Sequence, residues 1–216
     1  MIRIGIELNG IIRDINSQIA KYYVKDIDPK YDEGKINKNK TFIIDDLPFG
    51  SRGEKNEFLY TDYAYEIYGC GKTMELHTAS KLNEWLIKMS DEDEDYDISL
   101  FSLDEKNLAI PSTLFFLSKI AVRTRKIIFP TSDNIWNDFD VIITTNKEIV
   151  KKRPSDKVVI LINKDDNSDV KDKADYNFDG LIEFLTKSNE ISFTKENKSF
   201  IEIIKKYWKK IRYGKV

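Results

Sequence analysis

Polar residues follow each segment that the sequence predicts to be a buried strand. The first apolar run, residues 2–8, ends in Glu7-Leu8 and is broken by Asn9-Gly10, and a second run ends at Ser102. Two later runs end at Thr144-Thr145 and at Asn163-Lys164-Asp165-Asp166. In an open parallel sheet, ligands bind where the carboxyl ends of the strands meet. These strand ends are therefore the candidate site for binding and acid–base chemistry.

The stretch IGIELNGIIRD resembles the first motif of the haloacid dehalogenase-like (HAD-like) superfamily, an apolar strand followed by Asp-x-Asp-Gly and two apolar residues. In that family the first Asp takes the phosphoryl group, the second is the general acid/base, and both approach a magnesium ion. Glu7 and Asn9 stand at these positions here, and Ser102 stands where the second motif holds phosphoryl oxygens. The resemblance covers residues 1–24 and 92–165 and is nearest to the 5′-nucleotidase-like branch, which has a small cap.

Four departures from the family pattern predict that standard phosphoryl transfer has been lost. Glu7 adds a methylene to the nucleophile, and a shift of about 1 Å can cost on the order of 100-fold in rate. Asn9 cannot exchange a proton as an acid/base must. Thr144-Thr145 replaces the acidic pair that completes the magnesium site. Residues 130–139 contain no lysine to stabilise the transferring group, and the nearest lysines are Lys119, Lys126 and Lys147.

Two alternative interpretations remain open for these residues. Asp165 and Asp166 follow a strongly apolar segment and would be the true acidic motif if the strands were miscounted by one. With Glu7 as a further ligand, they would form the magnesium site of an active phosphohydrolase. In the second interpretation, the chain has an unrelated Rossmann-like fold, and Glu7 and Asn9 are ordinary polar residues at the end of a strand. Cys70 and His77 lack an orienting third group and are not expected to form a nucleophile–base pair.

Strands that alternate with helical patterns predict an α/β fold, a Rossmann-like parallel sheet of the HAD-like kind. The expected strands are 2–8, 98–102, 125–129, 140–145 and 157–163. The expected helices are 13–24, 54–68, 73–89, 111–122, 148–152, 178–186 and 193–213, and a short strand is expected at 41–44. The acidic run 90–97 is expected to be solvated rather than to bind an ion, because it lacks the pattern of a calcium loop.

The predicted strands and helices divide the chain into three parts. Residues 1–24 and 92–190 are expected to form the core, and residues 25–91 a cap-like insertion. Residues 191–216 are expected to form a C-terminal amphipathic helix. Its basic face and its Tyr207-Trp208 pair favour docking onto a protein partner or a second copy.

Composition limits the classes of function. The formal net charge of −2 does not indicate binding to nucleic acid, and no apolar run is long enough for a membrane span. One cysteine and one histidine exclude a disulfide within the chain and multi-histidine zinc sites. The apolar pattern starts at once and leaves no room for a secretion signal, so a cytoplasmic location is expected. Abundant Lys, Asn, Ile and Asp are typical of AT-rich genomes, such as those of many phages, for which host cytoplasm or virion would be the location.

The resemblance and its departures together predict a HAD-like protein that has lost phosphatase activity. Such a protein would act by binding or as a structural component of an assembly, and would need no cofactor. The alternative is an active magnesium-dependent phosphohydrolase of the 5′-nucleotidase-like kind, with an atypical site.

Overall fold

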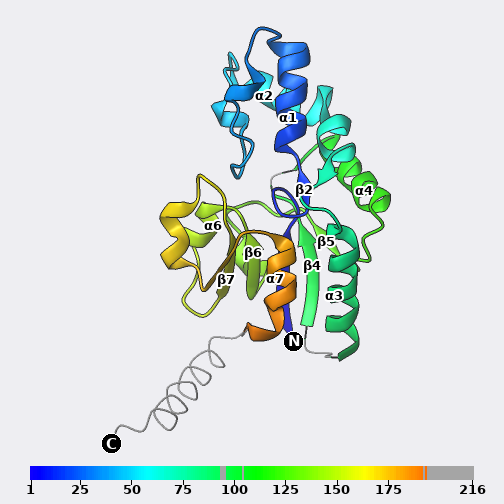
Figure 1. Cartoon of the computed structure of the whole chain (residues 1–216), viewed down its shortest axis with the longest axis vertical. Helices are drawn as coiled ribbons and strands as arrows, with labels where there is room; N and C mark the ends of the chain where they lie inside the picture. The colour runs from blue at the N-terminus through cyan, green and yellow to red at the C-terminus, as the bar shows by residue number, and fades with distance from the viewer. Residues whose placement is uncertain (93–95, 104, 192, 194–216) are drawn as a thin grey trace, which may run out of the picture.

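Six parallel strands form the central sheet, in the order β5-β4-β1-β6-β7-β8 (Figure 1). The computed structural model describes residues 1–92, 96–103, 105–191 and 193. The strands are β1 (Ile2–Glu7), β4 (Tyr96–Phe101), β5 (Ile127–Ile128), β6 (Val141–Thr144), β7 (Val158–Ile162) and β8 (Tyr176–Phe178). The expected α/β fold with a Rossmann-like parallel sheet is confirmed.

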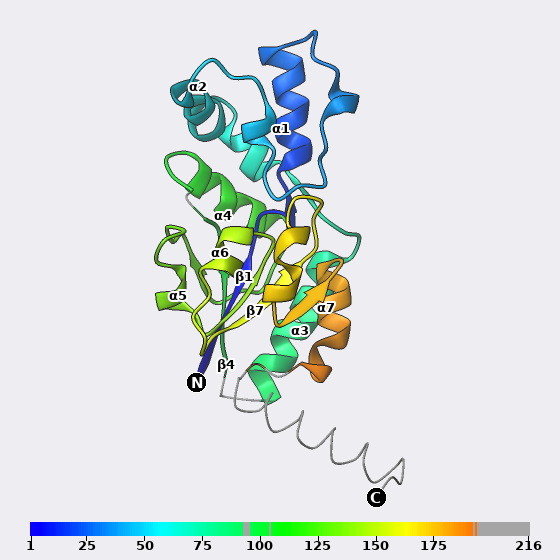
Figure 2. The ribbon, with the colours of Figure 1, turned by 90° about the vertical axis from the view of Figure 1, so that its left-hand side faces the viewer.

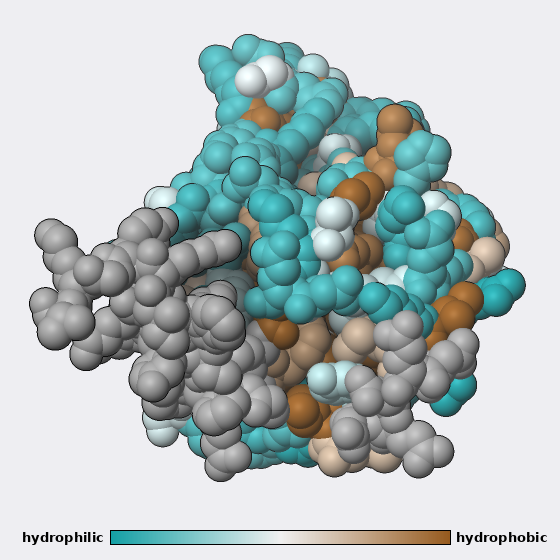
Figure 3. All heavy atoms as spheres, turned by 60° about the horizontal axis from the view of Figure 1, so that its bottom comes forward, coloured by the Kyte–Doolittle hydropathy of each residue, from teal (hydrophilic) through white to brown (hydrophobic). Residues whose placement is uncertain are grey.

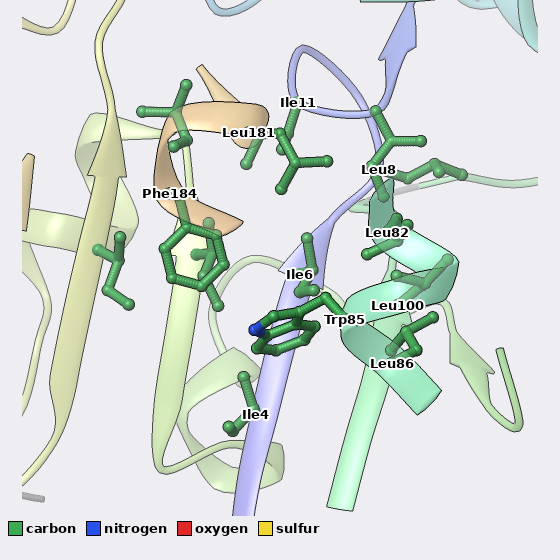
Figure 4. Close-up of a cluster of buried hydrophobic side chains, with 14 of the residues drawn as sticks. Ile4, Ile6, Leu8, Ile11, Leu82, Trp85, Leu86, Leu100, Leu181 and Phe184 are labelled. Atoms are coloured by element: carbon green, nitrogen blue, oxygen red, sulfur yellow. The ribbon is translucent and has the colours of Figure 1, made fainter. Parts of the chain in front are cut away.

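Helices cover both faces of this sheet, which explains why β6 and β7 are buried throughout and, apart from Thr144, apolar. On one face, α3 (Thr78–Glu92), α4 (Ala109–Lys119) and α7 (Leu181–Lys187) pack against side chains such as Ile4 and Ile6 (Figures 2 and 4). On the other face, α5 (Ile135–Asp138) and α6 (Lys147–Lys151) pack against Phe101, Ile142 and Val159. The sheet is therefore the middle layer of three.

The register of the sheet brings three strand ends together. Glu7 at the end of β1 pairs with Phe101 at the end of β4, one residue before Ser102. On the other side of β1, Ile6 pairs with Ile143 of β6, one residue before Thr144. Because β1 lies between β4 and β6, all three ends lie at the same edge of the sheet.

A helical insertion lies over this edge and has a hydrophobic cluster of its own (Figure 1). It contains α1 (Asn16–Tyr22), α2 (Arg52–Glu57) and three single-turn π-helices at Tyr23–Ile27, Phe58–Asp62 and Tyr65–Gly69. Its buried side chains include Ile15, Ile19, Ile43, Phe58 and Tyr68. The packing thus assigns α1 to the insertion and α3 to the sheet layer, whereas the sequence-based ranges assigned each to the other part.

Several boundaries differ from those expected from the sequence. Arg13–Asp14 (β2) pairs with Lys72–Thr73 (β3) as a small antiparallel ribbon, so α1 begins later than expected. For the same reason α3 begins at Thr78, and Leu76 lies before it with 84% of its surface exposed.

Two further segments differ in type. The strand expected at 41–44 is wrong: the chain forms a 3₁₀ turn at Ile44–Asp46, and the backbone N–H of Ile43 bonds to the Asn16 side chain rather than to a neighbouring strand. Tyr176–Phe178 extends the sheet as β8, because this segment pairs with β7, and α7 starts only after Gly180.

Some predictions fall partly outside the described residues. Residues 93–95 of the acidic run and residues 194–216, which include most of the predicted C-terminal helix, lie outside the described part of the chain. Phe193 is described, and it packs edge-on against Tyr96 with ring centroids 5.7 Å apart.

Hydrophobic side chains appear in small patches between hydrophilic ones on the face shown in Figure 3. No helix in the described part of the chain combines the length and the apolar character that crossing a membrane requires.

Candidate functional site at the carboxyl edge of the sheet

Glu7 is a buried carboxylate at the centre of this edge, with 5% of its surface exposed. Its Oε2 accepts hydrogen bonds from the Thr144 hydroxyl at 2.6 Å and from the Thr145 backbone N–H at 2.9 Å. Burial raises the pKa of the Glu7 carboxyl, although these bonds and the charge of Lys164 act in the opposite direction. The threonines at the end of β6 therefore orient Glu7 through one of its two oxygens.

Asn9 and Ser102, the other predicted site residues, bond to each other and to a buried ion pair. The Asn9 side-chain N–H donates to Ser102 Oγ at 3.0 Å, and the Asn9 carbonyl oxygen accepts from Arg13 Nε at 2.9 Å. Ser102 Oγ in turn donates to Glu105 Oε1 at 2.5 Å. The structure thus brings Asn9 and Ser102 together, but their polar groups are engaged within the protein.

The ion pair between Arg13 and Glu105 is the centre of this network. The side chains are 0% and 1% exposed, and Arg13 Nη2 lies 2.5 Å from Glu105 Oε1. Thr113 of α4 accepts from Arg13 Nη1 and donates to Glu105 Oε2, both at 2.6 Å. Arg13 also donates to the Tyr68 carbonyl oxygen at 2.7 Å. One buried arginine therefore ties the loop after β1 to the loop after β4, to α4 and to the insertion.

Gly10 permits the sharp turn between Glu7 and Arg13. Its φ of +75° lies in the left-handed region, and a Cβ there would come within 3.3 Å of the Thr145 hydroxyl. The Gly10 N–H donates to the Arg13 carbonyl oxygen at 2.9 Å. The Asn9-Gly10 break expected from the sequence is this turn, and it directs Arg13 back into the site.

Asp165 and Asp166 bind the insertion. The Asp165 carboxylate accepts from the side-chain N–H groups of Asn37 and Asn39, both at 2.8 Å. Asp166 Oδ1 accepts from the Thr41 backbone N–H at 2.9 Å and from its hydroxyl at 3.1 Å. The two carboxylates hold the segment 37–41 over the carboxyl edge of the sheet.

The carboxylates predicted as magnesium ligands are not assembled as a metal site. Glu7 Oε2 is bonded to threonines, while Asp165 and Asp166 are bonded to the insertion. Among the residues that the structure describes, no group of three or more His, Cys, Asp or Glu side chains could hold a metal ion. The donor set at this edge therefore does not fit the magnesium ion that the HAD-like resemblance implies.

None of the three lysines nearest to residues 130–139 takes the place of the lysine that stabilises the transferring group in the HAD-like family. Lys119 donates to the carbonyl oxygens of Gly69 and Gly71, Lys126 pairs with Asp97, and Lys147 donates to the Asp166 carbonyl oxygen. The cation that influences Glu7 is Lys164, which is 8% exposed. The sequence placed Lys164 at a strand end but gave it no role, because the lysine of the HAD-like pattern was expected two strands earlier.

A small cavity of about 120 Å³ opens beside Glu7. The described residues that line it are Glu7, Asn9, Ile15, Thr41, Phe42, Tyr60, Tyr68, Leu103 and Asn146. Phe42 and Tyr60 also line an outer cleft of about 660 Å³ between the insertion and the loop after β5. Arg13, Glu105 and Phe42 are site residues that the sequence did not predict, because charged and aromatic residues at such positions carry no local signal of what they will contact.

Cys70 and His77 are both exposed, and neither lines this cavity. No protein-family model matches the sequence, and no curated protein matches it either.

Proposed function

We propose that this chain is a HAD-like protein that does not transfer phosphoryl groups and that acts by binding a ligand or partner. The strand order supports the resemblance, because β1, β4 and β6 end side by side as the first, second and fourth motifs require. The helical insertion between β1 and β4 supports it as well, since it lies where a cap would lie.

One observation carries the loss of phosphatase activity: the groups that would hold and protonate a phosphate are bonded to one another. Ser102 Oγ donates to Glu105, and Asn9 is shared between Ser102 and Arg13. A phosphate at this position would have to break these bonds inside a buried network, and each buried group left unpaired costs about 1–3 kcal/mol. The arrangement stabilises the fold and leaves little for catalysis.

The magnesium-dependent alternative receives less support from the same groups. A hard dication needs several free carboxylate oxygens, whereas Asp165 and Asp166 accept hydrogen bonds from the insertion.

The test is phosphate release from p-nitrophenyl phosphate and from a panel of nucleoside monophosphates, with magnesium present. We expect the full chain to release no more phosphate than its Glu7→Ala variant. Robust turnover that is lost in Glu7→Ala, while circular dichroism shows both proteins folded, would overturn the proposal.

The C-terminal segment, residues 191–216, is proposed to dock onto a protein partner or onto a second copy of the chain. Residues 191–216 combine Tyr207 and Trp208 with eight Lys and Arg against two Glu, whereas the rest of the chain is net negative. Sedimentation of the full chain should then show association that Trp208→Glu reduces and that Lys173→Ala, at an exposed position outside the segment, does not. A strictly monomeric chain at high concentration, with no partner recovered by pull-down, would contradict this part of the proposal.

A further inference from the structure

The cavity beside Glu7 has mostly apolar and aromatic walls. Phe42, Tyr60 and Tyr68 line it together with Ile15 and Leu103. Its volume of about 120 Å³ is close to that of an engineered apolar cavity that holds benzene, about 150 Å³. A ligand of roughly four to six non-hydrogen atoms would fill such a space.

Glu7 is the one charged side chain among the described residues that line this cavity. All of its hydrogen bonds within the described part of the chain go to Oε2, from Thr144 and Thr145. Oε1 is therefore left for whatever occupies the cavity. The threonines hold the carboxylate in place, so its orientation is set before a ligand binds.

Most of the other polar side chains of the cavity are already bonded, including Asn146, whose Oδ1 accepts from the Glu148 backbone N–H at 2.9 Å. Asn9 is engaged with Ser102 and Arg13, and Thr41 with Asp166. Arg13 is neutralised by Glu105, so it offers no free positive charge to an anionic ligand. An anion would face the Glu7 carboxylate, and the described residues that line the cavity include no Lys or Arg to attract it, which disfavours phosphate and carboxylate ligands.

A cation would find both of the groups that it requires. The carboxylate oxygen supplies the opposite charge, and aromatic ring faces attract cations through their quadrupoles. Lys106 already lies over the Tyr60 ring at 4.8 Å, and Arg13 over the Tyr68 ring at 5.1 Å. Phe42 is therefore the aromatic wall on which a ligand would depend most.

We infer that this cavity binds a small organic cation, an aliphatic amine or quaternary ammonium group, between the Glu7 carboxylate and the Phe42 ring. The inference rests on the proposed function, in which the chain binds a ligand rather than transferring phosphate. The outer cleft shares Phe42 and Tyr60 with the cavity and is the route by which such a ligand would reach it.

The test is a titration of the full chain, followed by the amide NMR signals of Thr144, Thr145 and Thr41. The probes are tetramethylammonium and its neutral counterpart of equal size, tert-butanol. We expect saturable shifts with tetramethylammonium and affinity for tert-butanol at least about tenfold weaker, because tert-butanol can donate a hydrogen bond to the carboxylate but has no positive charge for the carboxylate and the rings to attract.

Three variants identify the residues responsible. Glu7→Gln should remove the preference for the cation, and Phe42→Leu should weaken its binding about threefold to tenfold. Lys164→Met should strengthen it a few-fold, because a competing positive charge is removed, an effect that a purely structural role would not produce. Phe115→Leu is the matched control, since this aromatic side chain is exposed on α4 and does not line the cavity.

Equal binding of tert-butanol, unchanged tetramethylammonium binding in Glu7→Gln, or no saturable shift at these amides would overturn the inference. These outcomes are separate from those that test the proposed function. Phosphate turnover would refute the non-catalytic proposal whatever the titration showed, whereas absent cation binding without turnover would refute the inference alone.

Discussion

Glu7 illustrates at the scale of one residue how a buried acid can oppose stability. Burial raises its pKa above the usual value of about 4.3, so the folded protein holds this proton more tightly than the unfolded chain does. The charged residue that acts on it is Lys164, while the neighbouring Arg13–Glu105 pair compensates itself. As pH rises from the unfolded pKa through the folded pKa, ionising Glu7 therefore lowers the free energy of unfolding.

The first prediction follows from this sign. Glu7→Gln cannot ionise, so its stability relative to wild type should increase from about pH 4 to about pH 8. Each unit by which the pKa is raised corresponds to about 1.4 kcal/mol. Urea unfolding at both pH values measures the difference.

Glu148 provides the control, because the hydrogen bond from Lys151 lowers the pKa of its carboxyl. Its contribution to stability is present above the unfolded pKa and is lost as pH falls. The stability of Glu148→Gln relative to wild type should therefore decrease from about pH 4 to about pH 8. The same sign for both variants would contradict the assignment of Glu7 as a carboxyl whose charged form is disfavoured.

Gly5 is required by close packing within β1. A Cβ at this position would lie 2.8 Å from the ring of Phe139, which is itself buried under α5 and α6. The second prediction is that Gly5→Ala lowers the free energy of unfolding by about 1–3 kcal/mol, because the ring cannot move away without disturbing this layer. Chemical denaturation measures it.

Gly53 is the matched control for that substitution. It lies in α2, and a Cβ there would meet only the Ser51 hydroxyl at 3.5 Å. Gly53→Ala should be neutral or stabilising by up to about 1 kcal/mol, since alanine favours the helix. Equal losses of unfolding free energy in Gly5→Ala and Gly53→Ala would show that the contact with Phe139 does not cause the destabilisation of Gly5→Ala.

At the scale of elements, the Arg13–Glu105 pair joins parts of the chain that are distant in sequence. Removing one partner of a buried pair leaves the other charge uncompensated. The third prediction is that Arg13→Met costs about 3–5 kcal/mol of stability and that the double variant Arg13→Met with Glu105→Leu recovers at least half of it. Thermal and urea unfolding of the three proteins form the comparison.

The exposed pair between Lys81 and Glu84 is the reference for this cost. It has a similar separation, 2.9 Å, but its side chains are 51% and 65% exposed. Lys81→Met should therefore cost no more than about 1 kcal/mol. A loss in Arg13→Met as small as this would mean that the buried network contributes little.

The segment 37–41 is held by the two aspartates after β7. The Asp165 N–H also donates to the Asn39 carbonyl oxygen at 3.0 Å. The fourth prediction is that Asp165→Ala with Asp166→Ala speeds hydrogen exchange of the Thr41 amide about fivefold to thirtyfold, because about 1–2 kcal/mol of local stabilisation is lost. Asp172→Ala, at an exposed position outside this contact, should leave that exchange rate unchanged.

At the scale of the whole molecule, the two largest hydrophobic clusters of the described residues lie in different parts of the fold. One belongs to the sheet and its helices, and the other to the insertion. Arg13 and the segment 37–41 are polar links between them. Cooperative unfolding of the two parts therefore depends on these polar links and on α4, whose Ala109 packs in the insertion cluster and whose Phe116 packs in the sheet cluster.

The fifth prediction concerns this cooperativity. Trp85 and Trp136 lie in the layers of the sheet, whereas tyrosines such as Tyr23, Tyr60 and Tyr68 lie in the insertion. In wild type, tryptophan fluorescence and tyrosine circular dichroism should follow the same denaturation curve. In the triple variant with Asp165→Ala, Asp166→Ala and Arg13→Met, the tyrosine signal should be lost at a lower urea concentration than the tryptophan fluorescence. Coincident curves in that variant would contradict the division into two clusters.

The sequence predicted the sheet well, because strands buried on both faces must be apolar and this pattern is local. The runs before Ser102, Thr144 and Asn163 all became strands, and Glu7 was correctly expected at a strand end. It did not predict β2, β3 or β8, because each is two or three residues long and exists only through its partner.

The sequence by itself determined an α/β chain with polar residues at the carboxyl ends of its strands, and an Asn9-Gly10 turn after the first. Only the tertiary structure decided how those residues are used: Asn9 and Ser102 in a network around Arg13, Asp165 and Asp166 on the insertion, and Glu7 with one oxygen left toward a cavity. The physical reason is that burial and apolar patterning are properties of neighbouring residues. Hydrogen-bond partners more than 90 residues away, such as Arg13 and Glu105, are determined only when the chain has folded.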